Sequence, residues 1–159
     1  MRRAYAPVAI LILLASISPA QEKQREEGEK QIDLKSVPKA VIIEFKRTYP
    51  NGVIKGCSKE RERGWTRYEL ETVDGKTKRD ILYDPDGTAI VIEEALPLSG
   101  LPQPVRDALK KEYPKGKVSK AEKIIKDDQT QYEVVVKSGK ESRELVYEAD
   151  GTLAKTEKK

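Results

Sequence analysis

The sequence contains no histidine among its 159 residues, which removes several kinds of catalytic site at once. A Ser-His-Asp or Cys-His nucleophile, a histidine general base and a histidine-based zinc site all need an imidazole. The side chains left for chemistry are carboxylates, lysines, tyrosines and one cysteine, Cys57. We therefore expect a protein that is not an enzyme, with no catalytic residues, no cofactor and no metal.

Two short acidic segments could in principle bind a cation. Residues 84–87 (Asp-Pro-Asp-Gly) offer two carboxylates and a glycine, but they lack the third ligand and the distal glutamate of an EF-hand. Asp127 and Asp128 stand where the first half of the chain has Arg63-Gly64. Both segments fall between expected strands, so we interpret them as turns. A periplasmic sensor of small molecules or metal ions built on these turns stays an alternative.

Cys57 is the only cysteine, so an exported monomer cannot form an internal disulfide. Its counterpart in the second half of the chain is Ala121, which favours a small, partly buried strand residue over a reactive thiol. A redox enzyme that worked through Cys57 would need an exposed thiolate of low pKa.

The charge pattern argues against nucleic acid as a partner. Lysine and arginine number 31 against 27 aspartates and glutamates, and loss of Arg2 and Arg3 with a leader would leave a net charge of +2. Basic and acidic residues alternate, as in residues 59–63 (Lys-Glu-Arg-Glu-Arg). Such mixing builds no sustained positive field for phosphates.

The start of the chain, from Met1 to Ala20, has the pattern of a secretory signal peptide. Arg2-Arg3 form a positive start, residues 8–17 are apolar, and Ser18-Pro19-Ala20 is a small-residue cleavage pattern. The apolar run is too short to span a bilayer. We predict cleavage after Ala20, a periplasmic or secreted location, and no stable membrane insertion of the mature chain.

The rest of the chain contains an internal repeat. Residues 37–94 align with 101–158 without a gap, and 18 of the 58 aligned positions are identical. Such self-similarity indicates a duplicated structural unit. We expect 1–20 to be the signal peptide, 21–36 a charged flexible leader, 37–94 the first repeat, 95–100 a linker and 101–159 the second repeat.

Each repeat is expected to begin with a helix and continue with four strands. Pro38 suits a first helical turn, and Val41, Phe45 and Tyr49 form an apolar stripe. Strands separated by turn residues follow at 53–62, 65–73, 76–83 and 88–94, and at 117–126, 130–137, 140–147 and from 152 onward. The predicted fold class is α+β, with two tandem α-β-β-β-β repeats whose helices pack on one face of an antiparallel sheet.

Alternation along these strands assigns the two faces of the sheet. The core face should carry Tyr68, Leu70, Thr72, Ile81 and Tyr83 and their counterparts Tyr132, Val134, Val136, Leu145 and Tyr147. The opposite face mixes charged and apolar residues, and no helix is left to cover it. We predict that a partner contacts this face at Trp65, Arg67, Glu69, Leu82, Val135 and Val146, because tryptophan is common at binding hot spots. The strand at 88–94 is apolar on both faces and should lie inside the sheet, at the seam between the halves.

Several of these features together resemble the PepSY-like family of bacterial periplasmic proteins, which is also described as similar to beta-lactamase inhibitor proteins. They are the paired Tyr-Pro-x-Gly segments at 49–52 and 113–116, the Asp-Gly segments at 86–87 and 150–151, and the leading signal peptide. The resemblance covers nearly all of residues 37–155. It implies a curved sheet with both helices on one side and a bare face that can hold another protein, in modules that restrain proteases or regulate envelope functions. We therefore expect an exported, non-catalytic protein-binding module that inhibits or regulates an envelope or secreted enzyme.

Overall fold

The computed structural model describes residues 28–158, so the predicted signal peptide and its cleavage site after Ala20 lie outside the described residues. The helices are α1 (Lys39–Thr48) and α2 (Gln103–Glu112), with short 3-10 helices η1 (Leu34–Ser36) and η2 (Leu98–Gly100) before them. The strands are β1 (Gly28–Gln31), β2 (Val53–Glu62), β3 (Trp65–Asp74), β4 (Thr77–Tyr83), β5 (Ala89–Ala95), β6 (Lys117–Lys126), β7 (Gln129–Ser138), β8 (Glu141–Glu148) and β9 (Leu153–Lys158).

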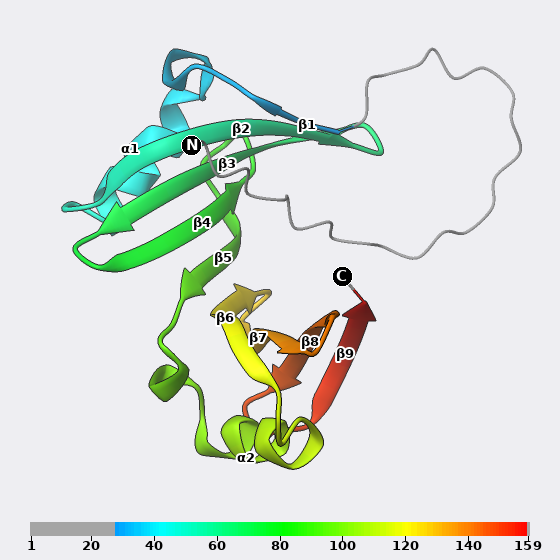
Figure 1. Cartoon of the computed structure of the whole chain (residues 1–159). Coiled ribbons are helices and arrows are strands. Elements are labelled where there is room, and N and C mark those ends of the chain that lie inside the picture. The colour runs from blue at the N-terminus through cyan, green and yellow to red at the C-terminus, as the bar shows by residue number, and fades with distance from the viewer. Residues whose placement is uncertain (1–27, 159) are drawn as a thin grey trace, which may run out of the picture.

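All nine strands form one antiparallel sheet in chain order, from β1 at one edge to β9 at the other (Figure 1). The α+β class is confirmed. β5, which we predicted to lie inside the sheet, pairs with β4 on one side and with β6 on the other. One continuous hydrogen-bonded ladder therefore joins the two halves of the molecule.

Residues 28–36, which we expected to be part of a flexible leader, are ordered instead. β1 pairs with β2 from Gly28 opposite Arg61 to Gln31 opposite Ser58, and η1 follows it. A charged strand can hold an edge position because backbone hydrogen bonds, and not buried side chains, fix it there. The C-terminal residues 156–158 belong to β9 and pair with β8.

The helices follow the predicted apolar stripe. Val41 and Phe45 of α1 are 0% and 1% exposed, and Val105 and Leu109 of α2 are likewise buried. Each helix ends where a tyrosine N–H donates a 2.8 Å hydrogen bond to the carbonyl four residues earlier, and a proline follows. A proline at that point cannot continue the helix, so the chain turns into the next strand.

The repeated Asp-Gly turns contact the start of each helix. Gly87 has a φ of +95°, and a Cβ atom there would lie 2.9 Å from the Ala40 carbonyl oxygen. Gly151 has a φ of +86°, and its Cβ atom would lie 2.7 Å from the Pro104 carbonyl oxygen. Only glycine meets both demands without strain. This requirement accounts for the recurrence of glycine at the same place in both repeats.

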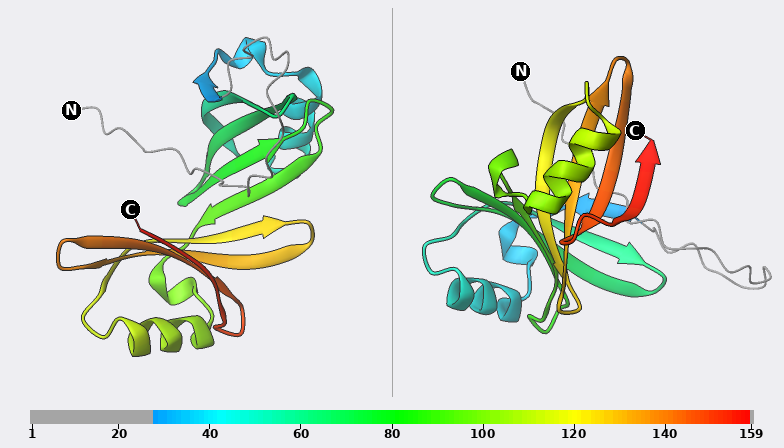
Figure 2. Two further views of the ribbon diagram at one scale, coloured as in Figure 1. Left: turned by 90° about the vertical axis from the view of Figure 1, so that its right-hand side faces the viewer. Right: turned by 90° about the horizontal axis from the view of Figure 1, so that it is seen from below.

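Both helices lie on the same face of the sheet, as predicted. In the register, Ile81 is opposite Ile92 and Ile92 is opposite Ile125, so these residues share one face across β4, β5 and β6. Each helix covers its own core cluster on that face, the first around Phe45 and the second around Leu109. Figures 1 and 2 show the helices at opposite ends of the twisted sheet, with α1 beside the first strands and α2 beside the last.

Candidate functional site

The candidate site is the sheet face opposite the helices, which we call the open face. No helix within residues 28–158 packs on it. The register places the following residues at its centre: Ser58 on β2, Glu69 and Glu71 on β3, Asp80 and Leu82 on β4, Val91 and Glu93 on β5, Lys120, Glu122 and Ile124 on β6, and Glu133 and Val135 on β7. The open face thus carries carboxylates on every strand from β3 to β7.

The six predicted contact residues all lie on the open face, but they differ in accessibility. Trp65 starts β3 beside the tip of the β2–β3 hairpin and is 67% exposed. Glu69 pairs with Leu82, whereas Val135 and Val146 lie in the other half, beyond β5 and β6. Their side chains therefore form two groups and not one patch.

Leu82 and Val135 are 5% and 6% exposed, although no described helix covers them. Side chains of neighbouring strands on the twisted face bury them instead. These two residues support the face more than they offer contact area. The predicted contacts that reach solvent are Trp65, Arg67, Glu69 and Val146.

Arg67 is engaged within the chain. Its Nε atom lies 3.7 Å from Asp84 Oδ1, and both side chains are 34% exposed. Asp84 is the first acidic residue of the segment that resembled a calcium loop. The pair therefore ties that turn to β3 and leaves part of the guanidinium accessible.

Three carboxyl groups on the open face hold their protons unusually tightly. Burial, together with the charges of Asp80, Glu29, Glu60 and Glu93, raises the pKa of Glu69 to about 8. Burial and nearby carboxylates, Glu122 among them, also raise the pKa of Glu93 to about 7 and that of Asp80 to about 6. Such values mean that negative charge on this face is poorly compensated.

The second half contains a cation that compensates this charge locally. Lys120 Nζ lies 2.6 Å from Glu122 Oε2 and 3.7 Å from Glu133 Oε1, and both glutamates are buried. Burial lowers the pKa of the Lys120 ammonium, but the hydrogen bond to Glu122 and the charges of both glutamates and Glu93 outweigh it, so the pKa is raised. Lys120 therefore stays charged in the middle of the acidic strands.

Four residues of the open face were not among the contacts predicted from the sequence: Ser58, Glu93, Lys120 and Glu122. In β6 the pairing shifts between Val118 and Lys120, which places Val118 on the core face and Lys120 on the open face. A bulge of this kind interrupts strict alternation. The same shift occurs at the matched place in β2, between Ile54 and Gly56. The repeat spacing, which aligns these two places, was the signal that could have revealed the bulge.

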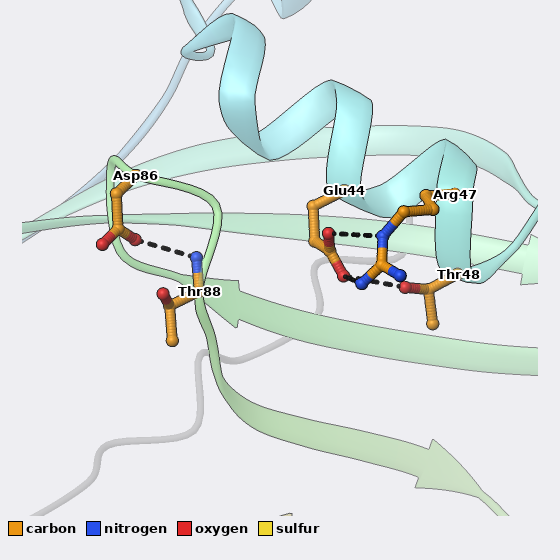
Figure 3. A network of polar contacts seen from close by, with 5 residues as sticks. All are labelled: Glu44, Arg47, Thr48, Asp86 and Thr88. Atoms are coloured by element: carbon orange, nitrogen blue, oxygen red, sulfur yellow. Dashed lines mark hydrogen bonds and ion pairs between the residues drawn. The ribbon is translucent and has the colours of Figure 1, made fainter.

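The other chemical candidates have structural roles. Cys57 is 5% exposed, its Sγ donates to the Ile32 carbonyl oxygen at 3.2 Å, and burial raises the pKa of the thiol. Asp86 Oδ1 accepts a 2.9 Å hydrogen bond from the Thr88 N–H (Figure 3), and Asp150 does the same for Thr152 at 2.8 Å. The predicted turns at residues 84–87 and at Asp127-Asp128 are confirmed, and a raised thiol pKa does not favour redox chemistry.

The described residues contain neither a metal-binding cluster nor a membrane-spanning helix. Between Gly28 and Lys158, no three histidine, cysteine, aspartate or glutamate side chains are arranged to hold a metal ion. None of the helices in the same span is long and apolar enough to cross a membrane.

A hollow of about 350 Å³ lies beside α2, away from the open face. Its apolar lining includes Leu98, Leu109, Val118 and Val136. It lies next to Leu109, the counterpart of the larger Phe45 in the first half.

The fold and the open face define a class, an α+β protein made of two helix-and-sheet units that share one antiparallel sheet. The family described as "Putative beta-lactamase-inhibitor-like, PepSY-like" matches residues 23–91 and again residues 68–155. The chain therefore belongs to this PepSY-like family. The double match agrees with the tandem repeat found in the sequence. No curated protein matches the chain significantly.

Solved structures with a similar fold come from Bacteroides species. A protein from Bacteroides fragilis described as like the beta-lactamase inhibitor protein is 20% identical, with a TM-score of 0.63 over 76% of this chain and 86% of that one. A protein from Bacteroides eggerthii described as "putative periplasmic" is 16% identical, with a TM-score of 0.67 over 77% and 88%. A DUF2874 family protein from Bacteroides uniformis is 15% identical, with a TM-score of 0.66 over 76% and 88%. At these identities the likeness concerns the fold.

Proposed function

We propose that this chain is an exported, non-catalytic module that binds an envelope or secreted protein through its open face and thereby inhibits or regulates it. Membership of a family described as beta-lactamase-inhibitor-like supports a role without catalysis. The neighbours described as periplasmic support a location in the envelope, reached through the predicted signal peptide and cleavage after Ala20.

The observation that carries the proposal is an open face that is uncovered and poorly compensated in charge. Within residues 28–158 no helix covers this face, so Trp65 stays exposed, while the surrounding side chains partly bury the carboxyl groups. Trp65 is 67% exposed on this face, and Glu69 holds its proton up to a pKa of about 8. A protein partner that buries the tryptophan and neutralises the carboxylates would remove both costs.

The test is affinity capture from envelope extract with residues 21–159, compared between matched variants. Trp65 on the open face and Ile43 on α1 are exposed to the same degree, 67% and 66%. We expect one protein to be retained in stoichiometric amount by the wild-type chain and by Ile43→Ala, and to be lost with Trp65→Ala and Val146→Asp. A retained protein that is lost with Ile43→Ala but kept with Trp65→Ala would place the binding surface on the helix face and contradict the proposal.

A further inference from the structure

Each half of the open face carries two neighbouring carboxyl groups, but only the second half has a lysine that reaches both of them. In the second half, Glu122 is opposite Glu133, and Lys120 reaches both at 2.6 and 3.7 Å. At the matched positions of the first half, Ser58 is opposite Glu69 and Gly56 is opposite Glu71. Gly56 stands where the second half has Lys120.

At this place the first half therefore has two neighbouring carboxyl groups, and no lysine stands between them. None of the described basic side chains lies within ion-pair distance of Glu69 or Glu71, and the charges that act on Glu69 come from Asp80, Glu29, Glu60 and Glu93. Buried carboxylates without a counter-charge are costly. Both glutamates remain partly exposed, so a group from outside can reach them.

A second feature of the first half points to a missing donor. Ser58 is 2% exposed, and its Oγ has no hydrogen-bond partner among the described residues. Strand alternation directs its side chain to the open face, because its neighbour Cys57 belongs to the core cluster on the other side. A buried hydroxyl that makes no hydrogen bond costs free energy, and a donor placed above it would recover that cost.

Gly56 has no side chain, and this leaves room above its backbone for the Glu71 carboxylate. A Cβ atom at Gly56 would lie 2.9 Å from the Glu71 carboxyl carbon, so the Glu71 carboxylate lies over the glycine backbone. Glu69, Glu71 and the Ser58 hydroxyl thus offer acceptors around one point of the open face. An ammonium group has three donors, which matches these three groups.

We propose that Ser58, Glu69 and Glu71 form a subsite for a lysine side chain of the protein partner, whose ammonium takes the place that Lys120 takes in the second half. This inference rests on the proposed function, because it assigns the chemistry of one contact within that interface. The inference goes beyond the proposed function by naming the residue type that the partner must present.

The test uses the peptide N-acetyl-Ala-Lys-Ala-amide as probe, with norleucine in place of lysine as the uncharged control of equal length. We expect the lysine peptide to shift the backbone amide resonances of Gly56, Ser58, Glu69 and Glu71 saturably, and the norleucine peptide not to do so. Glu69→Gln should weaken the binding about tenfold or more, because it removes a charge-assisted hydrogen bond. Binding should also tighten from pH 6 to pH 8.5.

The expected pH dependence follows from the groups that surround Glu69. Glu29 on β1, Glu60 on β2, Asp80 on β4 and Glu93 on β5 are acidic, and on β3 itself Arg67, which pairs with Asp84, and Glu71 flank it. As the pH rises, Glu69 loses its proton and its attraction for an ammonium grows. The acidic neighbours add to that attraction.

Two reciprocal variants make the test independent of the partner. Gly56→Lys places an ammonium in the subsite from within, and only the flexible Glu71 carboxylate must move to admit it. This variant should stay folded, lose the peptide shifts and lower the pKa of Glu69. The uncharged Gly56→Met serves as its control and should not lower the pKa of Glu69. Lys120→Met should open a second subsite, seen as new peptide shifts at Glu122 and Glu133.

Several outcomes would overturn the inference. They are the absence of shifts at the four amides in the wild type, equal shifts with the norleucine peptide, and the same shifts with calcium chloride at equal concentration. Failure of the inference is distinct from failure of the proposed function. A captured protein that depends on Trp65 but tolerates Gly56→Lys leaves the function intact and removes the lysine subsite. Peptide binding without any captured protein that depends on Trp65 leaves the lysine subsite intact and removes the proposed function.

Discussion

The two halves of this chain have the same arrangement of one helix packed on antiparallel strands, but they differ on the open face and in the core. On the open face, Lys120 and Glu122 of the second half correspond to Gly56 and Ser58 of the first. In the second half Lys120 therefore lies within ion-pair distance of both buried glutamates, whereas in the first half burial and neighbouring carboxylates raise the pKa of Glu69 to about 8. Under the proposed function, this difference places the contact with a cationic group of the partner in the first half.

The largest expected effect comes from removing the internal cation of the second half. Lys120→Met leaves Glu122 and Glu133 buried without their shared ammonium. We expect the free energy of unfolding at pH 7 to fall by about 2–3 kcal/mol, at the low end for broken buried pairs because Lys120 is partly exposed. Urea denaturation measures this value.

The matched control for this substitution is Lys123→Met. Lys123 Nζ lies 3.3 Å from Glu94, which also binds Arg79 at 2.7 Å. Because Glu94 keeps its arginine, the loss should stay below about 1 kcal/mol. Equal losses in the two variants would show that the Lys120 cluster is no more stabilising than a partly exposed ion pair.

The next effect concerns the cores, where Phe45 of the first half corresponds to Leu109 of the second. Phe45 is 1% exposed and packs its ring 5.7 Å from that of Tyr49, whereas Leu109 borders the hollow beside α2. Phe45→Leu should lower the free energy of unfolding by roughly 1–2 kcal/mol, since it removes ring atoms from a full core.

The reciprocal substitution, Leu109→Phe, should raise the thermal midpoint if the hollow accepts the ring. A Cβ atom at Gly116 would lie 2.6 Å from Val136 Cγ1. Val136 therefore already occupies part of the space that corresponds to the Phe45 ring of the first half. A fall in the midpoint as large as that of Phe45→Leu would show that Val136, and not the hollow, compensates for the smaller leucine. Calorimetry on both variants decides between these cases.

The pH dependence of stability tests the charge imbalance directly. The pKa values of Glu69, Glu93 and Asp80 in the folded chain, about 8, 7 and 6, lie above their ordinary values of 4.5, 4.5 and 3.8. The folded state therefore binds these protons more tightly than the unfolded state. Their contribution to stability is present in full below about pH 4 and is lost as the pH rises to about 8.

Glu69→Gln should reduce this loss, because glutamine stays neutral at every pH. We expect the variant to exceed the wild type by about 1–2 kcal/mol in free energy of unfolding at pH 8.5 and to differ little from it at pH 4.5. Glu44→Gln on α1, whose carboxylate already binds Arg47 and Thr48 (Figure 3), serves as the control and should leave the slope from pH 5 to 8 unchanged. A wild-type stability that rises between pH 5 and 8 would contradict the assigned pKa shifts.

Much of the fold could be predicted because its signals are local. The apolar stripe from Val41 to Phe45 and the Asp-Gly turn signals at 86–87 and 150–151 can each be recognised within a short stretch of the chain. β1 was missed because residues 28–31 are charged and polar, so nothing in their pattern resembles a buried strand. Backbone pairing with β2 holds them, and pairing depends on a partner distant in sequence.

The open face was predictable in outline but not at its centre. Alternation placed Glu69 and Val146 on the correct side, but it could not foresee that neighbouring side chains bury Leu82. The bulge before Lys120 hid the most informative cation, because one extra residue reverses the alternation in β6. Burial and cross-strand neighbours determine which charges matter, and both arise only when distant strands pair.

The smallest expected effect concerns Cys57 of the first half. It occupies the position that Ala121 occupies in the second half, and the two residues are 5% and 6% exposed. Cys57→Ala makes the first half resemble the second and removes the 3.2 Å contact of Sγ with the Ile32 carbonyl oxygen, so it should cost less than about 1 kcal/mol. Burial, with the charges of Asp33 and Glu71, raises the pKa of the thiol, so a thiol reagent should label the folded wild type far more slowly than the urea-unfolded chain. If the folded chain were labelled as fast as the unfolded one, β1 would open readily from β2. The first half would then differ from the second in the stability of its edge as well as in charge.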